Sequence, residues 1–147
     1  MTTDGDDRTI DEAALGQYLE EHVEGFHGLE RMVKFQAGQS NPTWRLDAES
    51  GTYVLRAKPP GELLKSAHQV DREFRVMQAL AGSDVPVPRM LHLATESQSP
   101  LGRTFFVMEH CDGRIFWDPA LPEIATSEER GAIYDAMNAA LGALHSV

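Results

Sequence analysis

The sequence has a single cysteine, few basic residues and no long apolar run, and each shortage excludes a class of protein. Cys111 is the only cysteine, so the chain has no internal disulfide and too few thiols for a zinc site built on cysteine. Thirteen Lys and Arg against 23 Asp and Glu give a net charge of -10, which opposes binding to nucleic acid or to an anionic membrane surface. No apolar run approaches the roughly 18 residues of a membrane span.

The amino terminus and the composition favour a globular protein of the cytoplasm. The start, "MTTDGDDRTIDE", is acidic and polar, unlike the basic and apolar start of a signal peptide. With 147 residues, 41% of them apolar and 24% charged, the chain is long enough for one domain with its own core. Residues 1–10 are rich in Asp, Thr and Gly, and we expect a disordered tail there.

Three stretches have the periodicity of amphipathic helices. The first covers residues 11–23, the second lies around residues 64–80 and ends before Gly82, and the third begins at Thr126 with a capping-box pattern. Their apolar stripes are, in order, Leu15, Leu19 and Val23; Leu64, Val70, Phe74, Met77 and Leu80; and Ile133, Met137, Ala140, Leu141 and Leu144.

Five short segments predict strands that are linked mostly by hairpins. They are residues 29–35, 43–46, 52–57, 90–95 and 104–109, with turn-forming residues at 47–51 and 96–103. Short strands joined in this way favour antiparallel pairing. The sequence therefore predicts an α+β fold with a five-stranded antiparallel sheet and with the helices on one side.

The loop "GQSNPT", Gly38 to Thr43, raises the question of function because it joins the first two predicted strands. Most glycines in such loops only turn the chain. However, the strand at residues 52–57 carries Arg56, with Lys58 two residues later on the same face, and the next helix carries Glu73. A strand cation paired with a helix acid can bind nucleotide phosphates below a turn that offers its N–H groups. An exposed strand charge and a solvated helix face are the plainer alternatives.

Several motifs together resemble the aminoglycoside phosphotransferase-like kinases. They occur in that family's order and are "GQSNPTW", "YVLRAKPPG", "VDREFRVMQAL", "VPVPRMLHL", "FFVMEHCDGRIF" and "AALGALH". The similarity covers about residues 34–145 and looks most like the branch attached to, or near, acyl-CoA dehydrogenases. It implies a protein-kinase-like N-terminal lobe that binds the nucleotide at residues 11–111. A linker and the first helix of a truncated C-terminal lobe would follow at residues 112–147.

The resemblance also implies a role for each matching residue at the phosphates of ATP. The positioning loop would run from Gly38 to Thr43, with Ser40, Asn41 and neighbouring amides near the β- and γ-phosphates. Arg56 stands where most related kinases have a lysine, and Lys58 is the alternative for that role. Glu73 would be the partner on the helix.

The adenine end of the site is implied in the same way. Val54 would cover one face of the ring and Met108 would lie at the back of the pocket, where a plain core methionine is an equal alternative. The segment "VMEHCDG" matches the linker between the lobes, so Glu109 C=O and Cys111 N–H would read the adenine. The thiol of Cys111 is otherwise a small apolar filler.

The family's catalytic H-x-D loop and its Mg²⁺-binding Asp would follow the helix that ends in "LHSV". The one H-x-D triplet, His110-Cys111-Asp112, belongs to the linker motif. We therefore expect no catalytic residue and no metal ligand here, and no activity from this chain by itself. The parent would transfer the γ-phosphate of ATP to a hydroxyl of a small molecule, either an aminoglycoside or a hydroxyacyl compound. The alternatives are a non-catalytic nucleotide-binding or protein-interaction module and an α+β domain without a ligand.

The last helix predicts an association of two copies. Met137, Leu141 and Leu144 would pack on the missing lobe, and without it they form an apolar stripe with no partner. Our hypothesis is that the chain hides the stripe either in a homodimer through this helix or by swapping the helix between two copies. Light scattering after size exclusion tests this expectation, and a monomer at high protein concentration would contradict it.

Overall fold

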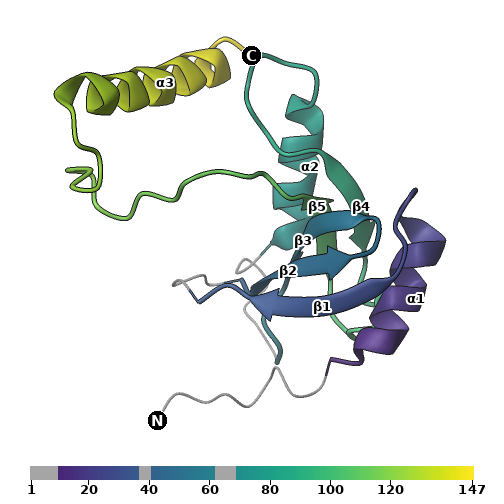
Figure 1. Cartoon of the computed structure of the whole chain (residues 1–147). Helices are drawn as coiled ribbons and strands as arrows, with labels where there is room; N and C mark the ends of the chain where they lie inside the picture. The colour runs from purple at the N-terminus through teal and green to yellow at the C-terminus, as the bar shows by residue number, and fades with distance from the viewer. Residues whose placement is uncertain (1–9, 37–40, 62–68) are drawn as a thin grey trace. The chain divides into compact units, whose positions relative to one another are not determined.

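The computed structural model describes residues 10–36, 41–61 and 69–147. Its helices and strands follow one another along the chain as Figure 1 shows. They are α1 (Glu12–His22), β1 (Leu29–Lys34), β2 (Thr43–Ala48), β3 (Gly51–Ala57), α2 (Val70–Leu80), β4 (Met90–Ala94), β5 (Phe105–Glu109) and α3 (Ser127–His145). These elements fall at the predicted positions. The part of the second predicted helix around Leu64 lies outside the described residues, as does most of the predicted tail.

The chain divides into two compact units. The first consists of Met1–Ala79 and Pro88–His110 and contains α1, the five strands and nearly all of α2. The second consists of Leu80–Val87 and Cys111–Val147 and contains α3. In the described residues, no helix is long and apolar enough to cross a membrane.

The strands form one five-stranded sheet in the order β1-β2-β3-β5-β4, and every neighbouring pair is antiparallel. This confirms the predicted sheet. In the hairpin between β2 and β3, Ala48 pairs with Gly51, so the turn predicted over residues 47–51 is only Glu49 and Ser50. Gly51 has a φ of 144°, which side chains disfavour, so a glycine is needed where this hairpin closes.

The prediction that the helices lie on one side of the sheet is wrong, because α1 and α2 pack on opposite faces. Leu15 and Leu19 of α1 belong to a buried cluster with Phe105. Phe74 of α2 instead belongs to a cluster with Phe106. Since neighbouring residues of a strand point to opposite faces, these two phenylalanines place the helices on different sides. The apolar run from Phe105 to Val107 carries this signal in the sequence, because a strand covered on both faces loses its alternation.

The helix starts agree with the cap residues in the sequence. The carboxylate of Asp11 accepts a hydrogen bond of 3.0 Å from Ala14 N at the start of α1. At the start of α3, the hydroxyl of Thr126 accepts from Glu129 N at 3.2 Å. The Glu129 carboxylate does not return to the cap. It pairs with Arg114 at 3.1 Å instead, which ties the segment before the helix to its first turn.

The apolar stripe of α3 is exposed to solvent. The side chains of Met137, Leu141 and Leu144 are 60%, 51% and 45% exposed, and no residue of this helix is buried. Such a stripe agrees with the sequence analysis. Pairing with a second copy stays a prediction.

A pair of aromatic side chains links α1 to the edge strand β4. The hydroxyl of Tyr18 lies 2.9 Å from Nε2 of His92, and the ring of His22 stacks on Tyr18 with a centroid distance of 4.0 Å. Burial lowers the pKa of His92 below its ordinary 6.5, and the nearby charge of His22 lowers it further. Burial also raises the pKa of Tyr18. This contact therefore favours a neutral His92.

We predict that His92 makes the fold less stable as the pH falls below about 6.5. With a lower pKa in the folded state, His92 takes up a proton on unfolding, so the free energy of unfolding decreases between the ordinary pKa and the folded pKa. His92→Gln should flatten this part of the pH profile, and His145→Gln at the end of α3 is the control. Urea unfolding from about pH 5 to pH 7 measures the slope. An unchanged slope in His92→Gln would contradict the assignment.

Candidate functional site

The centre of the candidate site is an ion pair between β3 and α2. Nε of Arg56 donates to Oε2 of Glu73 at 2.6 Å, and Nη2 donates to Oε1 at 3.3 Å. Strand alternation places Arg56 on the face of the sheet that α2 covers, where Phe106 is its direct neighbour on β5. The side chains are 19% and 36% exposed. The guanidinium is therefore held in a defined orientation with two hydrogen bonds to one carboxylate.

Asn41 and Thr43 extend this ion pair to the start of β2. Nδ2 of Asn41 donates to Oε1 of Glu73 at 3.1 Å, and Nη1 of Arg56 donates to the hydroxyl of Thr43 at 3.0 Å. That hydroxyl in turn donates to the backbone oxygen of Asn41 at 3.1 Å. Both Asn41 and Thr43 are buried. We call these four residues, Asn41, Thr43, Arg56 and Glu73, the Arg56–Glu73 network.

An apolar surface continues from this network along the same face of the sheet. Val54 lies two residues before Arg56 on β3, and Met108 is directly opposite Val54 on β5. Val54 is buried and Met108 is partly buried. The face of the sheet beneath α2 therefore has a charged end and an apolar end. This combination suits a ligand with a flat apolar part and an anionic part.

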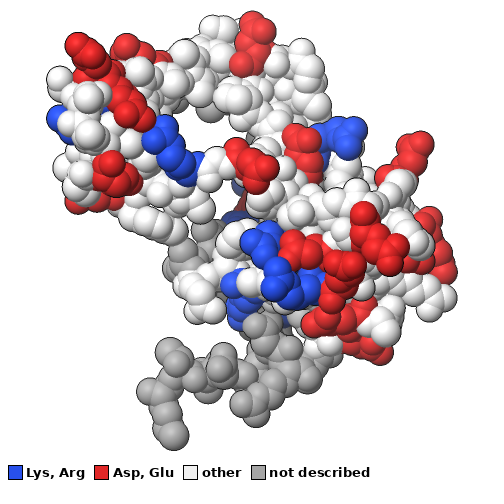
Figure 2. All heavy atoms as spheres, in the orientation of Figure 1, with Lys and Arg blue, Asp and Glu red and all other residues white. Residues whose placement is uncertain are grey.

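A second charged cluster lies on this face of the sheet. Asp47 accepts hydrogen bonds from Arg45 at 3.0 and 3.1 Å, and its Oδ2 lies 2.7 Å from Nη2 of Arg31. The hydrogen bonds from Arg31 and then from Arg45 lower the pKa of Asp47. The alternation from Thr43 through Arg45 to Asp47 could have predicted this cluster, but the sequence analysis missed it. Figure 2 shows basic side chains over β1 and β2 with acidic ones beside them.

The predicted phosphate residues are only partly brought together. Gly38 and Ser40 lie outside the described residues. Arg56 forms the ion pair with Glu73, and Asn41 and Thr43 are hydrogen-bonded to that pair. Lys58 has no described contact with it. Its backbone N–H donates to Thr104 O at 2.9 Å, and its side chain lines a hollow beside α2.

The two residues predicted to read the edge of the adenine, Glu109 and Cys111, lie at and after the end of β5. The backbone N–H of Glu109 donates to Arg89 O at 2.9 Å, and its carboxylate accepts from Arg89 N at 2.8 Å. Cys111 is exposed and belongs to the second unit. The reading of adenine by Glu109 C=O and Cys111 N–H stays a prediction.

The described residues contain no group of three or more His, Cys, Asp or Glu that could hold a metal ion. Glu73 is engaged by Arg56 and Asn41, and Asp47 is engaged by two arginines. Both carboxylates are therefore already engaged by other described side chains.

The chain is similar to known proteins over nearly its full length. A model of the phosphotransferase enzyme family matches residues 31–147. The human "Acyl-CoA dehydrogenase family member 11" is 45% identical over 143 residues, which are 94% of this chain and 18% of that protein. The mouse "Acyl-CoA dehydrogenase family member 10" is 46% identical over 140 residues, which are 94% of this chain and 13% of that protein.

A solved structure shares the fold as well as the sequence. It is a Ralstonia eutropha protein provisionally named an aminoglycoside phosphotransferase, with a TM-score of 0.75 and 44% identity. The alignment covers 93% of this chain and 38% of that protein. The chain thus spans a minor part of each of these relatives.

We predict that the Arg56–Glu73 pair stabilises the fold more than an exposed pair on the same helix does. Glu73→Ala would leave a largely buried guanidinium without its carboxylate and should lower the free energy of unfolding by about 1–3 kcal/mol. The control is Asp71→Ala, which removes an exposed pair with Arg75 at 3.8 Å and should cost at most about 0.5 kcal/mol. Urea unfolding measures both variants. Equal losses would show that Glu73 is only a surface acid.

Proposed function

The chain belongs to the phosphotransferase enzyme family, and we propose that it is the ATP-binding lobe of a kinase for small molecules. The parent would transfer the γ-phosphate of ATP to a hydroxyl group. The observation that carries this proposal is the Arg56–Glu73 ion pair, which joins a strand cation to a helix acid beside the loop that ends at Asn41. A phosphoryl-transfer site needs such a positioned cation, because its main tasks are orientation and neutralisation of charge.

The network residues would act on the phosphates. Glu73 orients the guanidinium of Arg56 next to Asn41, and the N–H groups of Arg56 that Glu73 does not use would contact the phosphates. Hydrogen bonds to Thr43 and Asn41 connect the ion pair to the start of β2. Because the side chain of Arg56 is already ordered, binding a ligand would cost less conformational entropy. The loop amides around Gly38 and Ser40 would add N–H donors to the β- and γ-phosphates. ATP, when bound, supplies the phosphoryl group.

The apolar end of the face would hold the base. Val54 and Met108 are directly opposite each other on β3 and β5, so they offer a continuous apolar surface to a flat ring. Glu109 C=O and Cys111 N–H would then read the edge of the adenine through the backbone. The fit of the residues to ATP therefore rests on a partly buried network at one end and apolar side chains at the other.

We place the catalytic base and the Mg²⁺ ligands outside this chain. The carboxylates nearest to the proposed phosphate position are engaged by arginine or asparagine side chains. A kinase needs further carboxylates that hold the metal ion and orient the attacking hydroxyl. We therefore assign to this chain binding and positioning only.

We propose that the acceptor of the phosphate is a small molecule with a hydroxyl group. Two classes of acceptor are candidates, a hydroxyacyl compound and an aminoglycoside. The names of the relatives at 44–46% identity connect this lobe with acyl-CoA dehydrogenases and favour a hydroxyacyl compound. The name of the solved structure favours an aminoglycoside. The fold itself does not decide between them, because one fold carries many substrates.

We predict that Arg56→Ala weakens the binding of ATP to this chain by at least about tenfold, because it removes a charge-assisted contact to the phosphates. Arg56→Lys keeps the charge but loses the planar guanidinium, so its affinity for ATP should lie between those of the unmodified chain and Arg56→Ala. Arg31→Ala removes an equal charge from β1 and is the matched control. Calorimetric titration with ATP and Mg²⁺ measures the affinities, with thermal unfolding to verify that each variant is folded.

The outcomes separate the competing functions. A tenfold loss in Arg56→Ala with no change in Arg31→Ala supports the ATP-binding lobe. No binding of ATP to the unmodified chain would favour a protein-interaction module. Equal binding by all variants would remove Arg56 from the nucleotide site.

A further inference from the structure

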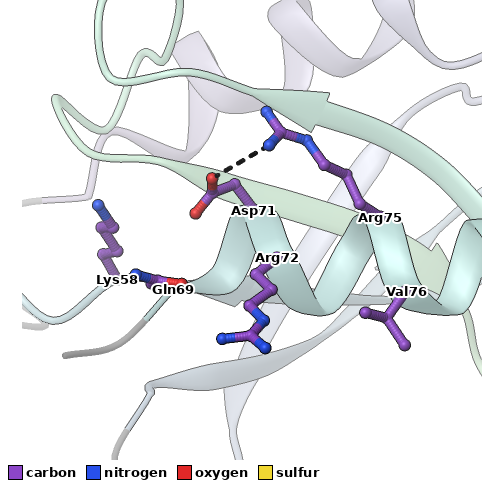
Figure 3. A pocket seen from close by; sticks show the side chains of 6 residues that line it. All are labelled: Lys58, Gln69, Asp71, Arg72, Arg75 and Val76. Atoms are coloured by element: carbon purple, nitrogen blue, oxygen red, sulfur yellow. Dashed lines mark ion pairs between the residues drawn. The ribbon is translucent and has the colours of Figure 1, made fainter. Parts of the chain in front are cut away.

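A hollow beside α2 gathers basic side chains that the Arg56–Glu73 network does not use. Its volume is about 490 Å³. Its walls come from the residue after β3, the residue before α2 and α2 itself. The lining residues are Lys58, Gln69, Asp71, Arg72, Arg75 and Val76. Figure 3 shows Lys58 and Gln69 at the amino-terminal end of α2, with Arg72 and Val76 along one side of the helix and Asp71 and Arg75 along the other.

The hollow carries an excess of positive charge in an acidic chain. Its described lining residues include three cations and one carboxylate, whereas the whole chain has a net charge of -10. Asp71 lies 3.8 Å from Nη1 of Arg75, so this acid is engaged on the helix itself. Lys58 and Arg72 have no ion-pair partner among the described residues. Two cations from different segments of the chain therefore line the hollow without an ion pair to any described residue.

We propose that this hollow binds a phosphate group of a small molecule. A single arginine satisfies a carboxylate, but a phosphate dianion gains from two or more cations around its oxygens. The excess of two positive charges matches such a dianion, and the amide of Gln69 adds a neutral donor. The volume is larger than a phosphate group needs, and Val76, which is 52% exposed, gives the hollow an apolar rim. The ligand is therefore a phosphate ester or anhydride with a further organic part.

The proposal adds to the proposed function and does not depend on it. The hollow and the Arg56–Glu73 network have no residue in common. It also gives Lys58 a role of its own, whereas the sequence analysis named it only as the alternative to Arg56 as the cation that pairs with Glu73. The phosphate could belong to the nucleotide or to a second molecule, since the chemistry of recognition is the same.

Titration with inorganic pyrophosphate at constant ionic strength tests the hollow. In ¹⁵N spectra of the chain, the amides of Gln69, Arg72 and Val76 should shift with saturation. Lys58→Gln and Arg72→Gln should each weaken this binding by roughly two- to fivefold, as expected for one exposed charge contact. Arg31→Gln removes the same charge from β1 and should leave the affinity unchanged. The residues changed are not buried, so each variant should fold, and thermal unfolding verifies this.

Three results would overturn the proposal. They are an unchanged affinity in both Lys58→Gln and Arg72→Gln, an equal loss in Arg31→Gln, and shifts confined to other parts of the chain. Repeating the titration on the chain saturated with ATP identifies the source. Retained binding of pyrophosphate indicates the phosphate of a second molecule, and competition indicates the phosphates of the nucleotide. If ATP does not bind at all, the proposed function fails, whereas the titration with pyrophosphate still tests whether the hollow binds phosphate.

Discussion

The hydrogen-bonded ion pair between Arg56 and Glu73 is the interaction on which the proposed site depends. It joins a central strand to α2, and through Asn41 and Thr43 it also holds the start of β2. A guanidinium this far from solvent is stable only with a carboxylate and further acceptors around it. The same contacts that neutralise the charge also fix its direction. The cation is thereby preorganised beside Asn41 and Thr43, which would lower the entropy cost of binding an anion there.

The two faces of the sheet differ, because one carries the larger apolar core and the other carries the candidate site. On the face of α1, buried side chains such as Leu19, Leu55 and Phe105 form a continuous core with few polar groups. The face of α2 has a smaller core around Phe74 and Phe106, flanked by the network and by the Arg31–Asp47–Arg45 cluster. A sheet covered on one side only would have to take its stability and its ligand contacts from the same face. Here α1 supplies apolar burial independently of the candidate site.

Much of the fold could be predicted from the sequence because its signals are local. Cap residues such as Asp11 and Thr126 mark helix starts by bonding to the next turn, and Gly51 marks the close of a hairpin. The site was harder to predict. The places of Arg56 and Glu73 on a strand and a helix predict their pairing, but they do not decide between Arg56 and Lys58 as the cation. Spacing by two residues places both side chains on one face only while the strand continues, and β3 ends at Ala57.

The sequence by itself determined the elements, their antiparallel pairing and the family, since these follow from periodicity, turn chemistry and motif order. The tertiary structure alone decided that the helices cover opposite faces and that Arg56, not Lys58, meets Glu73. It also decided that Asp47 lies between two arginines and that Lys58 and Arg72 line the same hollow. The reason is physical. Local patterns state which side chains share a face of one element, whereas partners across elements depend on how the apolar faces pack, and that is settled only when the whole chain folds.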